Sequence, residues 1–206
     1  MATNKEFVSI LKISIKALLH KVIAFRPFIL IKNKGSMIEV GKHTFLNKSW
    51  GFKRTFHNKA TGQLYLGSNA RLKLGQNVSI MSGCNITINN NATLTVGNNT
   101  LINQNTKIDS FKSIIIGDNC AISENVVIRD SNNHTVLNDK KYKITEPIVI
   151  GNHVWIGLNA IILPGAVIGD NAIIGAGAIV TGKIDPNTLN VGVPAKAIKK
   201  EINWER

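Results

Sequence analysis

The chain has 206 residues, which fits one domain with short appendages and is long enough to bury a sizeable core. Its 25 Lys and Arg exceed its 12 Asp and Glu, giving a formal net charge of +13. This excess indicates either a well-solvated surface or an anionic partner, such as membrane headgroups, an acidic glycan or a phosphorylated cofactor. No basic motif interleaved with aromatic residues occurs, so we expect no nucleic-acid partner.

Residues 1–34 differ in character from the rest of the chain, because apolar residues recur there at helical spacing. The lysines that interrupt the apolar run are Lys5, Lys12, Lys16 and Lys21. They are too frequent for a transmembrane helix, and the segment lacks the small-residue cleavage site of a secretory signal. We therefore predict an N-terminal amphipathic helical segment, ended by Arg26-Pro27 because the residue before proline leaves the α region.

Two interpretations of residues 1–34 stay open. The predicted helix packs on the rest of the protein or on a partner subunit, or it lies on an anionic membrane surface through its basic face. We expect a cytoplasmic protein, which in the second case is peripheral at the inner face of the membrane. In either case residues 1–34 are separate from the domain that follows.

Residues 38–56 are ambiguous, but from Leu64 on a regular unit recurs in which two aliphatic residues, one residue apart, precede a glycine. These glycines are Gly67, Gly75, Gly97, Gly117 and Gly151. From Gly75 to Gly97 is 22 residues, from Gly97 to Gly117 is 20, and from Gly117 to Gly151 is 34. The unequal intervals indicate one repeating structure with insertions of different length.

The stretch from Ile148 to Ile184 shows the repeat in its most regular form, with a period of six residues. Aliphatic residues stand at Ile150, Ile156, Ile162, Ile168, Ile174 and Val180, with a small residue four positions after most of them. Neither a helix nor a plain strand has this period, whereas a coil with three flat sides and 18 residues per turn does. The aliphatic residue points inward, and glycine often follows it at a bend. This pattern is the hexapeptide parallel β-helix signature.

Since one turn of the coil takes 18 residues, the 34-residue interval contains about 16 extra residues. We therefore predict an excursion loop at 129–147, between Ile128 and Ile148. Long loops on a rigid scaffold are where functional residues usually lie. This loop contains His134, flanked by polar residues, and a loop histidine with a near-neutral pKa can act as a general base.

Residues 185–206 are expected to cap the coil. Asp185-Pro186-Asn187 forms a turn and Gly192–Ala195 a second bend. The helix-forming residues 195–201 predict a short C-terminal helix that covers the edge of the last turn. Two cysteines, Cys84 and Cys120, stand at small inward positions and are interpreted as separate core residues rather than a disulfide or metal ligands, as suits a reducing compartment.

Residues 64–200, about two-thirds of the chain, resemble the hexapeptide-repeat acyltransferases of the left-handed β-helix type. The resemblance rests on His134 in the loop, on VWIGLNAIILPGAVIGDNAIIGAGAIVTGKI, and on VGVPAKAI. Within that group the chain is most similar to the sugar and capsular-polysaccharide O-acetyltransferases. The resemblance implies an all-β solenoid, a left-handed parallel β-helix over 35–184, that assembles as a homotrimer. It also implies acetyl-CoA as co-substrate, bound in clefts between neighbouring coils, and no metal.

The same resemblance assigns roles to particular residues. It makes His134 the base that deprotonates the acceptor hydroxyl, and it places Trp155 in the active site. The residues that match acetyl-CoA contacts are Leu158, Ala176, Thr181, Gly182, Lys196 and Lys199. Leu158 stands where relatives commonly carry Ser, so its contact would run through the backbone. Lys196 and Lys199 stand where relatives often carry Arg, so point charges replace bidentate phosphate contacts.

On the acceptor side, Asn103 aligns with a polar position of galactoside acetyltransferase, and Asp130 is placed to orient His134. The expected function is transfer of an acetyl group from acetyl-CoA to a sugar hydroxyl, in a bacterial surface polysaccharide or its precursor. Acetylation of an antibiotic or a simple galactoside, and a non-catalytic structural solenoid, stay open as alternatives. A metal lyase of the γ-carbonic anhydrase kind is disfavoured, because it needs three histidines and the matching region holds His134 and His153.

Overall fold

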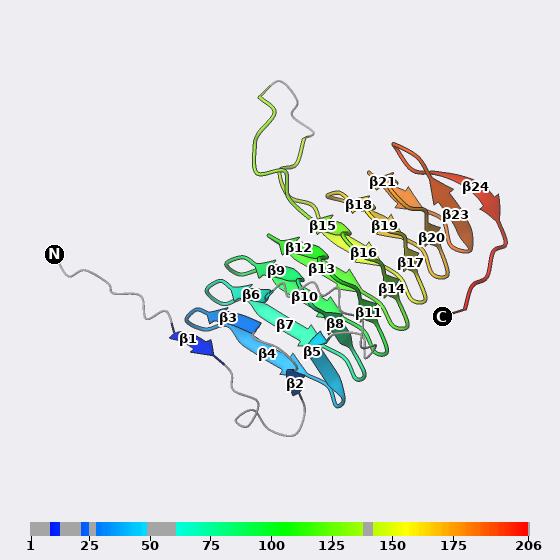
Figure 1. The fold of residues 1–206 in the computed structure, drawn as a ribbon. Coiled ribbons are helices and arrows are strands. Elements are labelled where there is room, and N and C mark those ends of the chain that lie inside the picture. The colour runs from blue at the N-terminus through cyan, green and yellow to red at the C-terminus, as the bar shows by residue number, and fades with distance from the viewer. Residues whose placement is uncertain (1–8, 13–21, 25–27, 49–60, 138–141, 206) are drawn as a thin grey trace.

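The computed structural model describes residues 9–12, 22–24, 28–48, 61–137 and 142–205. Within these ranges every regular element is a β-strand, and the strands wind into a coil of three sheets (Figure 1). Each turn passes in order through sheet C, sheet B and sheet A, so the coil has a C–B, a B–A and an A–C corner. We confirm the predicted all-β solenoid, and the three parallel sheets fit a left-handed β-helix.

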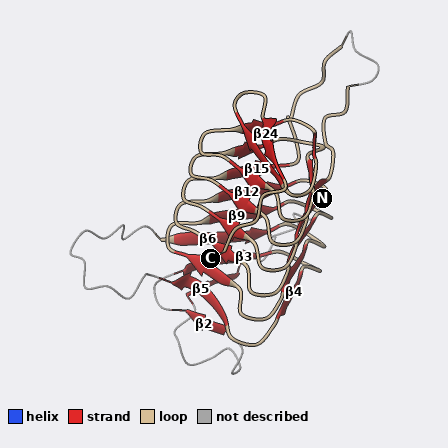
Figure 2. Cartoon of the chain, turned by 90° about the vertical axis from the view of Figure 1, so that its right-hand side faces the viewer, coloured by secondary structure: helices blue, strands red, loops and turns tan. Residues whose placement is uncertain are grey.

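The strands of each sheet stack along the coil axis (Figure 2). Sheet A contains β1 (Ser9–Lys12), β3 (Phe28–Lys32), β6 (Gly62–Leu66), β9 (Asn85–Ile88), β12 (Lys107–Ser110), β15 (Val127–Arg129), β18 (Ile161–Ile162) and β21 (Ile179–Val180). Sheet B contains β2 (Val22–Ala24), β5 (Thr44–Lys48), β8 (Ser79–Met81), β11 (Leu101–Ile102), β14 (Ala121–Ile122), β17 (Trp155–Ile156), β20 (Ile173–Ile174), β23 (Thr188–Val191) and β24 (Lys196–Lys200). Sheet C contains β4 (Met37–Val40), β7 (Arg71–Leu74), β10 (Thr93–Val96), β13 (Ser113–Ile116), β16 (Ile148–Ile150), β19 (Val167–Ile168) and β22 (Lys183–Ile184).

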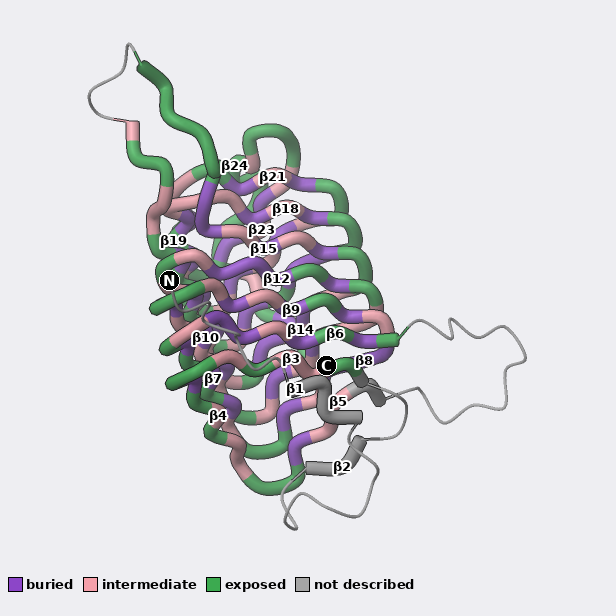
Figure 3. Tube along the Cα trace, turned by 90° about the vertical axis from the view of Figure 1, so that its left-hand side faces the viewer, coloured by how far each residue is buried: buried purple, intermediate pink, exposed green. Residues whose placement is uncertain are grey.

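The strand register confirms the six-residue period. Ile150 pairs with Ile168, Ile156 with Ile174 and Ile162 with Val180, each 18 residues further on. The longer early turns also appear as predicted: Leu74, Val96, Ile116 and Ile150 are successive partners in sheet C. The inward residues form one continuous buried column, visible as purple bands in Figure 3. Burial of this aliphatic column supplies the main driving force for the fold.

The corners explain the abundance of asparagine and glycine. Asparagines such as Asn119 and Asn171 adopt a positive φ of 58° and 60°, a conformation that asparagine tolerates well. The glycines after inward aliphatic residues serve a different need, because neighbouring turns approach them closely. A Cβ atom added at Gly157 would lie 2.7 Å from the backbone nitrogen of Ala176. Close approach, rather than a left-handed backbone, therefore explains Gly157.

The predicted helices are wrong where the structure describes them. In residues 1–34 it shows β1, β2 and β3, and β2 and β3 pair in parallel with strands of the coil. The remaining parts of the predicted N-terminal helix lie outside the described residues. The predicted C-terminal helix at 195–201 is instead β24, which pairs antiparallel with β23. At both ends the open edge of a sheet offers hydrogen-bond partners, which outweighs weak helix propensity.

The predicted excursion begins after β15 and ends at β16, where the chain projects from the A–C corner (Figures 1 and 2). Its base is a short antiparallel ribbon with a bridge between Ser131 and Thr145. The backbone N–H of Asn132 donates to the carbonyl of Ile144 at 2.8 Å. No helix among the described residues is long and apolar enough to cross a membrane.

Candidate active site

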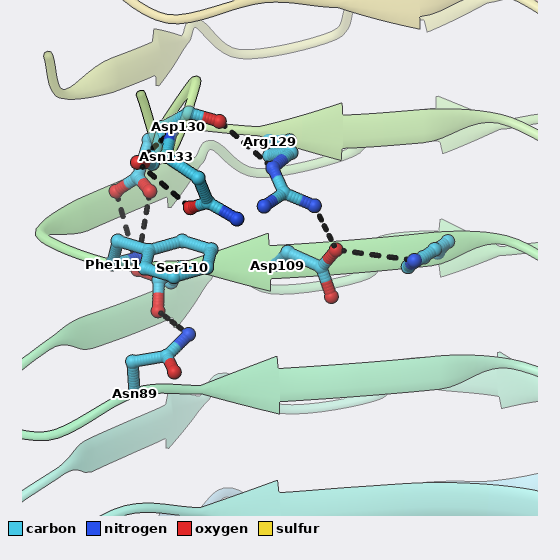
Figure 4. A network of polar contacts seen from close by, with 9 residues as sticks. Asn89, Asp109, Ser110, Phe111, Arg129, Asp130 and Asn133 are labelled. Carbon is cyan, nitrogen blue, oxygen red and sulfur yellow. Dashed lines mark hydrogen bonds and ion pairs between the residues drawn. The ribbon is translucent and has the colours of Figure 1, made fainter. Parts of the chain in front are cut away.

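The first residue of the excursion beyond β15, Asp130, is fully buried, and its carboxylate accepts hydrogen bonds from the preceding turn (Figure 4). The backbone N–H of Phe111 donates to Oδ1 at 2.6 Å, and those of Lys112 and Ser113 donate to Oδ2 at 2.9 and 2.8 Å. Charge-assisted bonds of this kind are among the strongest in proteins. Asp130 therefore ties the start of the loop to the bend between β12 and β13. Its predicted roles towards His134 or the acceptor stay predictions.

Arg129, the last residue of β15, makes a second anchor (Figure 4). Its Nη1 lies 3.2 Å from Oδ2 of Asp109, and its Nε–H donates to the carbonyl of Ser131 at 2.7 Å. Its guanidinium carbon lies 5.0 Å from the ring centroid of Phe111. Lys107 also pairs with Asp109, at 3.3 Å, so two cations share one carboxylate whose side chain is 8% exposed.

Ser131 makes the third anchor of the loop base. Its hydroxyl accepts from the backbone N–H of Asn133 at 3.2 Å and from the hydroxyl of Thr145 at 3.1 Å, and it donates to Oδ1 of Asn133 at 3.3 Å. Asn133 has a φ of 64°. His134 follows directly and is exposed. The loop therefore presents an accessible imidazole just beyond a tightly bonded base.

Trp155 points outward from sheet B and is 41% exposed. Its Nε1–H donates to the hydroxyl of Ser123 at 3.3 Å. Its ring centroid lies 5.9 Å from that of Trp204, with 44° between the planes. Trp204 and Ser123 were missed by sequence reasoning, because neither belongs to the repeat pattern and their proximity to Trp155 depends on how turns stack.

The residues predicted to contact acetyl-CoA occupy the C-terminal turns. Leu158 and Ala176 are exposed at the B–A corner, where the carbonyl of Leu158 accepts from the N–H of Gly177 at 2.8 Å. Thr181 and Gly182 lie at the A–C corner, between β21 and β22. A Cβ atom added at Gly177 or Gly182 would meet nothing within 4 Å, so the space outside both is open.

The two predicted phosphate-binding lysines, Lys196 and Lys199, are exposed on β24 at the edge of sheet B. The bend before β24 returns to the coil, since the N–H of Ala195 donates to the carbonyl of Ile179 at 2.8 Å. Asn103, the predicted acceptor residue, lies at the end of β11, at the B–A corner. Its Oδ1 accepts from the backbone N–H of Gln104 at 2.8 Å.

The topology divides the predicted site into two groups. One group stands at the A–C corner and comprises Asp130, His134, Thr181 and Gly182. The other lies on sheet B or its corner with sheet A and comprises Asn103, Trp155, Leu158, Ala176, Lys196 and Lys199. In a three-sided coil the A–C corner is opposite sheet B. One chain therefore does not bring His134 and Trp155 together.

In the part of the chain that the structure describes, no group of three or more His, Cys, Asp or Glu side chains could hold a metal ion. His153, the second histidine of the matching region, binds Asn171 Oδ1 through its Nδ1 at 3.0 Å.

Comparisons with known proteins identify the repeats. Residues 147–182 match the family "Bacterial transferase hexapeptide (six repeats)", and residues 93–129 match "Hexapeptide repeat of succinyl-transferase". The two matches bracket the excursion loop. Galactoside O-acetyltransferase of Escherichia coli (strain K12) is 53% identical over 47 residues, which are 23% of each chain. The match thus spans about a quarter of this curated relative.

Solved structures extend the similarity over most of the chain. The polysialic acid O-acetyltransferase OatWY has a TM-score of 0.68 and 25% identity, covering 83% of this chain and 77% of its own. The polysialic acid-specific acetyltransferase NeuO has a TM-score of 0.64 and 23% identity, covering 87% and 89%, which shows a shared fold. These findings confirm the resemblance to the hexapeptide-repeat acetyltransferases.

Proposed function

We propose that this hexapeptide-repeat chain is an O-acetyltransferase that moves an acetyl group from acetyl-CoA to a sugar hydroxyl. The observation that carries the proposal is the exposed His134, held just beyond a triply anchored loop base and bracketed by two hexapeptide-repeat segments. A catalytic base must be accessible to substrate, and its backbone must be positioned. An ordinary surface loop needs neither buried anchors nor a histidine at this place.

In the proposed reaction His134 accepts the proton of the acceptor hydroxyl while its oxygen attacks the thioester carbonyl carbon of acetyl-CoA. The new C–O bond forms, the C–S bond breaks, and the thiolate of CoA takes up the proton from His134. A positioned base of this kind typically contributes about 100- to 10,000-fold in rate. The imidazole is neutral again at the end, so the enzyme is unchanged.

The predicted acetyl-CoA residues, which lie on sheet B, at the B–A corner and at the A–C corner, supply the binding surface for acetyl-CoA. Open space outside Gly177 and Gly182 lets an extended chain approach the backbone without steric conflict. The exposed Lys196 and Lys199 are free to approach phosphate groups as point charges. Trp155 presents a partly exposed indole face on β17 of the same sheet B, from which β20 and β23 separate the two lysines on β24.

Because His134 and Trp155 lie on opposite sides of one coil, a complete site needs residues from two copies. A cyclic homotrimer can bring the A–C corner of each subunit beside sheet B of a neighbour and so form three equivalent sites. We therefore include the homotrimer in the proposal. Its support is the division of the predicted site between two sides of the chain.

The proposed acceptor is a bacterial surface polysaccharide or its precursor, since OatWY is a polysialic acid O-acetyltransferase of similar fold. The net charge of +13 favours an acidic glycan of this kind. We further propose a cytoplasmic protein whose lysines in residues 1–34 contact the anionic inner face of the membrane. A small acceptor, such as a simple galactoside, is the second candidate, favoured by the 53% sequence identity with galactoside O-acetyltransferase over 47 residues.

The test measures release of free CoA from acetyl-CoA with a panel of acceptors: acidic polysaccharides, their oligosaccharide precursors and simple galactosides. We expect release above the rate without acceptor for one class, and loss of that release in His134→Ala. Asn132→Ala is the matched control, because Asn132 is an exposed residue of the same loop. No acceptor-dependent release from any class would support a non-catalytic solenoid instead.

A further inference from the structure

Arg129 is the last residue of β15, where the chain leaves the coil and the excursion begins. Asp109 is its register partner on the neighbouring strand β12, and both side chains stand on the outer face of sheet A. The Asp109 side chain is 8% exposed, so its charge requires a close cation. Lys107 and Arg129 both meet that requirement, at 3.3 and 3.2 Å.

Arg129 contacts two groups at once through its planar guanidinium, whereas Lys107 pairs with Asp109. One nitrogen pairs with Asp109 on the coil, while Nε–H donates to the carbonyl of Ser131 in the loop at 2.7 Å. Phe111 lies against the guanidinium at 5.0 Å and limits its movement. A lysine has a single charged nitrogen and offers no such planar fork.

The bond to Ser131 is connected to His134 through a short chain of contacts. The hydroxyl of Ser131 accepts from the N–H of Asn133, which holds a left-handed backbone with φ of 64°. The next residue is His134. A shift of the Ser131 carbonyl therefore changes the position of the His134 backbone without disturbing the buried column.

We propose that Arg129, fixed by Asp109, is a positioning residue that sets the placement of His134 for catalysis. The inference deepens the proposed acetyl transfer and rests on it. Figure 4 shows that Arg129 lies beside the loop base, with Asp130 making a separate set of contacts. Asp130 bonds backbone amides of the preceding turn, so its loss should lower stability as well as release the start of the loop, whereas loss of the Arg129 fork should affect the loop alone.

The first experiment compares Arg129→Lys with Lys107→Met. Arg129→Lys keeps a cation beside Asp109 and removes the fork. We expect kcat to fall by about 10- to 100-fold, since small misplacements of a catalytic group have large effects. The KM for acetyl-CoA and the Tm should stay close to those of the wild type. Lys107→Met should leave kcat unchanged, because Lys107 touches Asp109 but not the loop.

Asp109→Asn, which retains the Ser131 bond, should give a smaller fall in kcat than Arg129→Lys.

The decisive measurement is a double-mutant cycle with His134→Ala. If Arg129 acts through His134, adding Arg129→Lys to His134→Ala causes no further loss of the residual rate. An equal fold-loss in both backgrounds, or a rise in acceptor KM with unchanged kcat, would overturn the proposal. The proposed function fails differently: His134→Ala would then retain wild-type turnover, whatever the effect of Arg129→Lys.

Discussion

The imidazole of His153 stacks on the indole of Trp204, with ring centroids 4.3 Å apart and 5° between the planes. The indole N–H of Trp204 also donates to the carbonyl of His153 at 2.9 Å. His153 stands at the C–B corner, so the end of the chain crosses back over turns that precede it. Through Trp204 the tail also reaches Trp155, at 5.9 Å.

Trp204→Ala should lower the free energy of unfolding by about 1–3 kcal/mol, because Trp204 is 9% exposed and loses both the stacking contact and the hydrogen bond. Trp204→Phe is the matched control, since it retains a stacked ring and lacks the N–H donor. Trp204→Phe should therefore lower the free energy of unfolding less than Trp204→Ala does. Urea unfolding of the two variants measures the difference, and an unchanged stability of Trp204→Ala would show that the tail is only loosely attached.

His134→Ala should impair turnover without unfolding the protein. His134 is exposed and outside the buried column, and such substitutions usually change stability by no more than about 0.5 kcal/mol. Loss of a general base should lower kcat/KM by about 100- to 10,000-fold. Steady-state kinetics together with a melting curve and CoA titration check both statements. Turnover near that of the wild type would exclude His134 as the base.

Asp130→Ala should lower stability, unlike His134→Ala. It removes the acceptor of the part-buried backbone N–H groups of Phe111, Lys112 and Ser113, and a hydrogen bond to a charged group is typically worth about 1.5–3 kcal/mol. We therefore expect a clear fall in Tm. Asp130→Asn keeps an oxygen acceptor, so its Tm should fall less than that of Asp130→Ala. Equal Tm values for wild type and Asp130→Ala would mean that the three contacts contribute little to stability.

The two cysteines should resist thiol reagents in the folded protein. Burial raises the pKa of Cys84 to about 12 and that of Cys120 to about 11, from an ordinary value of 9.0. Both are free and buried, as the sequence predicted. Thiol reagents at pH 8 should label neither cysteine in the native state and both in denaturant. Rapid labelling of the native protein would show that the coil opens locally.

The same pKa values predict a pH dependence of stability. Unfolded thiols ionise near pH 9, whereas folded ones keep their protons to about pH 11 or 12. Stability from this source is therefore complete below pH 9 and is lost as the pH rises towards these values. Urea unfolding at pH 8 and pH 10.5 should show the fall, and Cys84→Ala should reduce its slope. An identical slope in Cys84→Ala would assign the fall to other groups.

The sequence predicted the coil accurately because each hexad forms one side of a turn, so Ile150 and Ile168 pair wherever the period holds. The intervals between glycines even located the excursion. Prediction failed at the ends, where β1 and β24 pair with sheet edges, since pairing depends on the three-dimensional edge and not on local periodicity. Arg129 and Trp204 could not be identified as important because their partners come from other turns.

The separation of His134 and Trp155 gives the strongest test of a shared site. If neighbouring copies each supply one residue, two inactive variants can complement one another in a mixed oligomer. Co-expression of His134→Ala with Trp155→Ala, carrying different affinity tags, yields oligomers in which some sites combine the intact His134 of one subunit with the intact Trp155 of another.

For random 1:1 mixing, such a combination occurs at about a quarter of the sites in a cyclic trimer, so about a quarter of wild-type activity should return. The control is a mixture of separately purified variants that have not exchanged subunits, which should stay inactive. Light scattering establishes that the mixed species is a trimer. A trimer of mixed composition with no recovered activity would mean that His134 and Trp155 act within one chain, whereas an active Trp155→Ala homotrimer would mean that Trp155 is not part of the site.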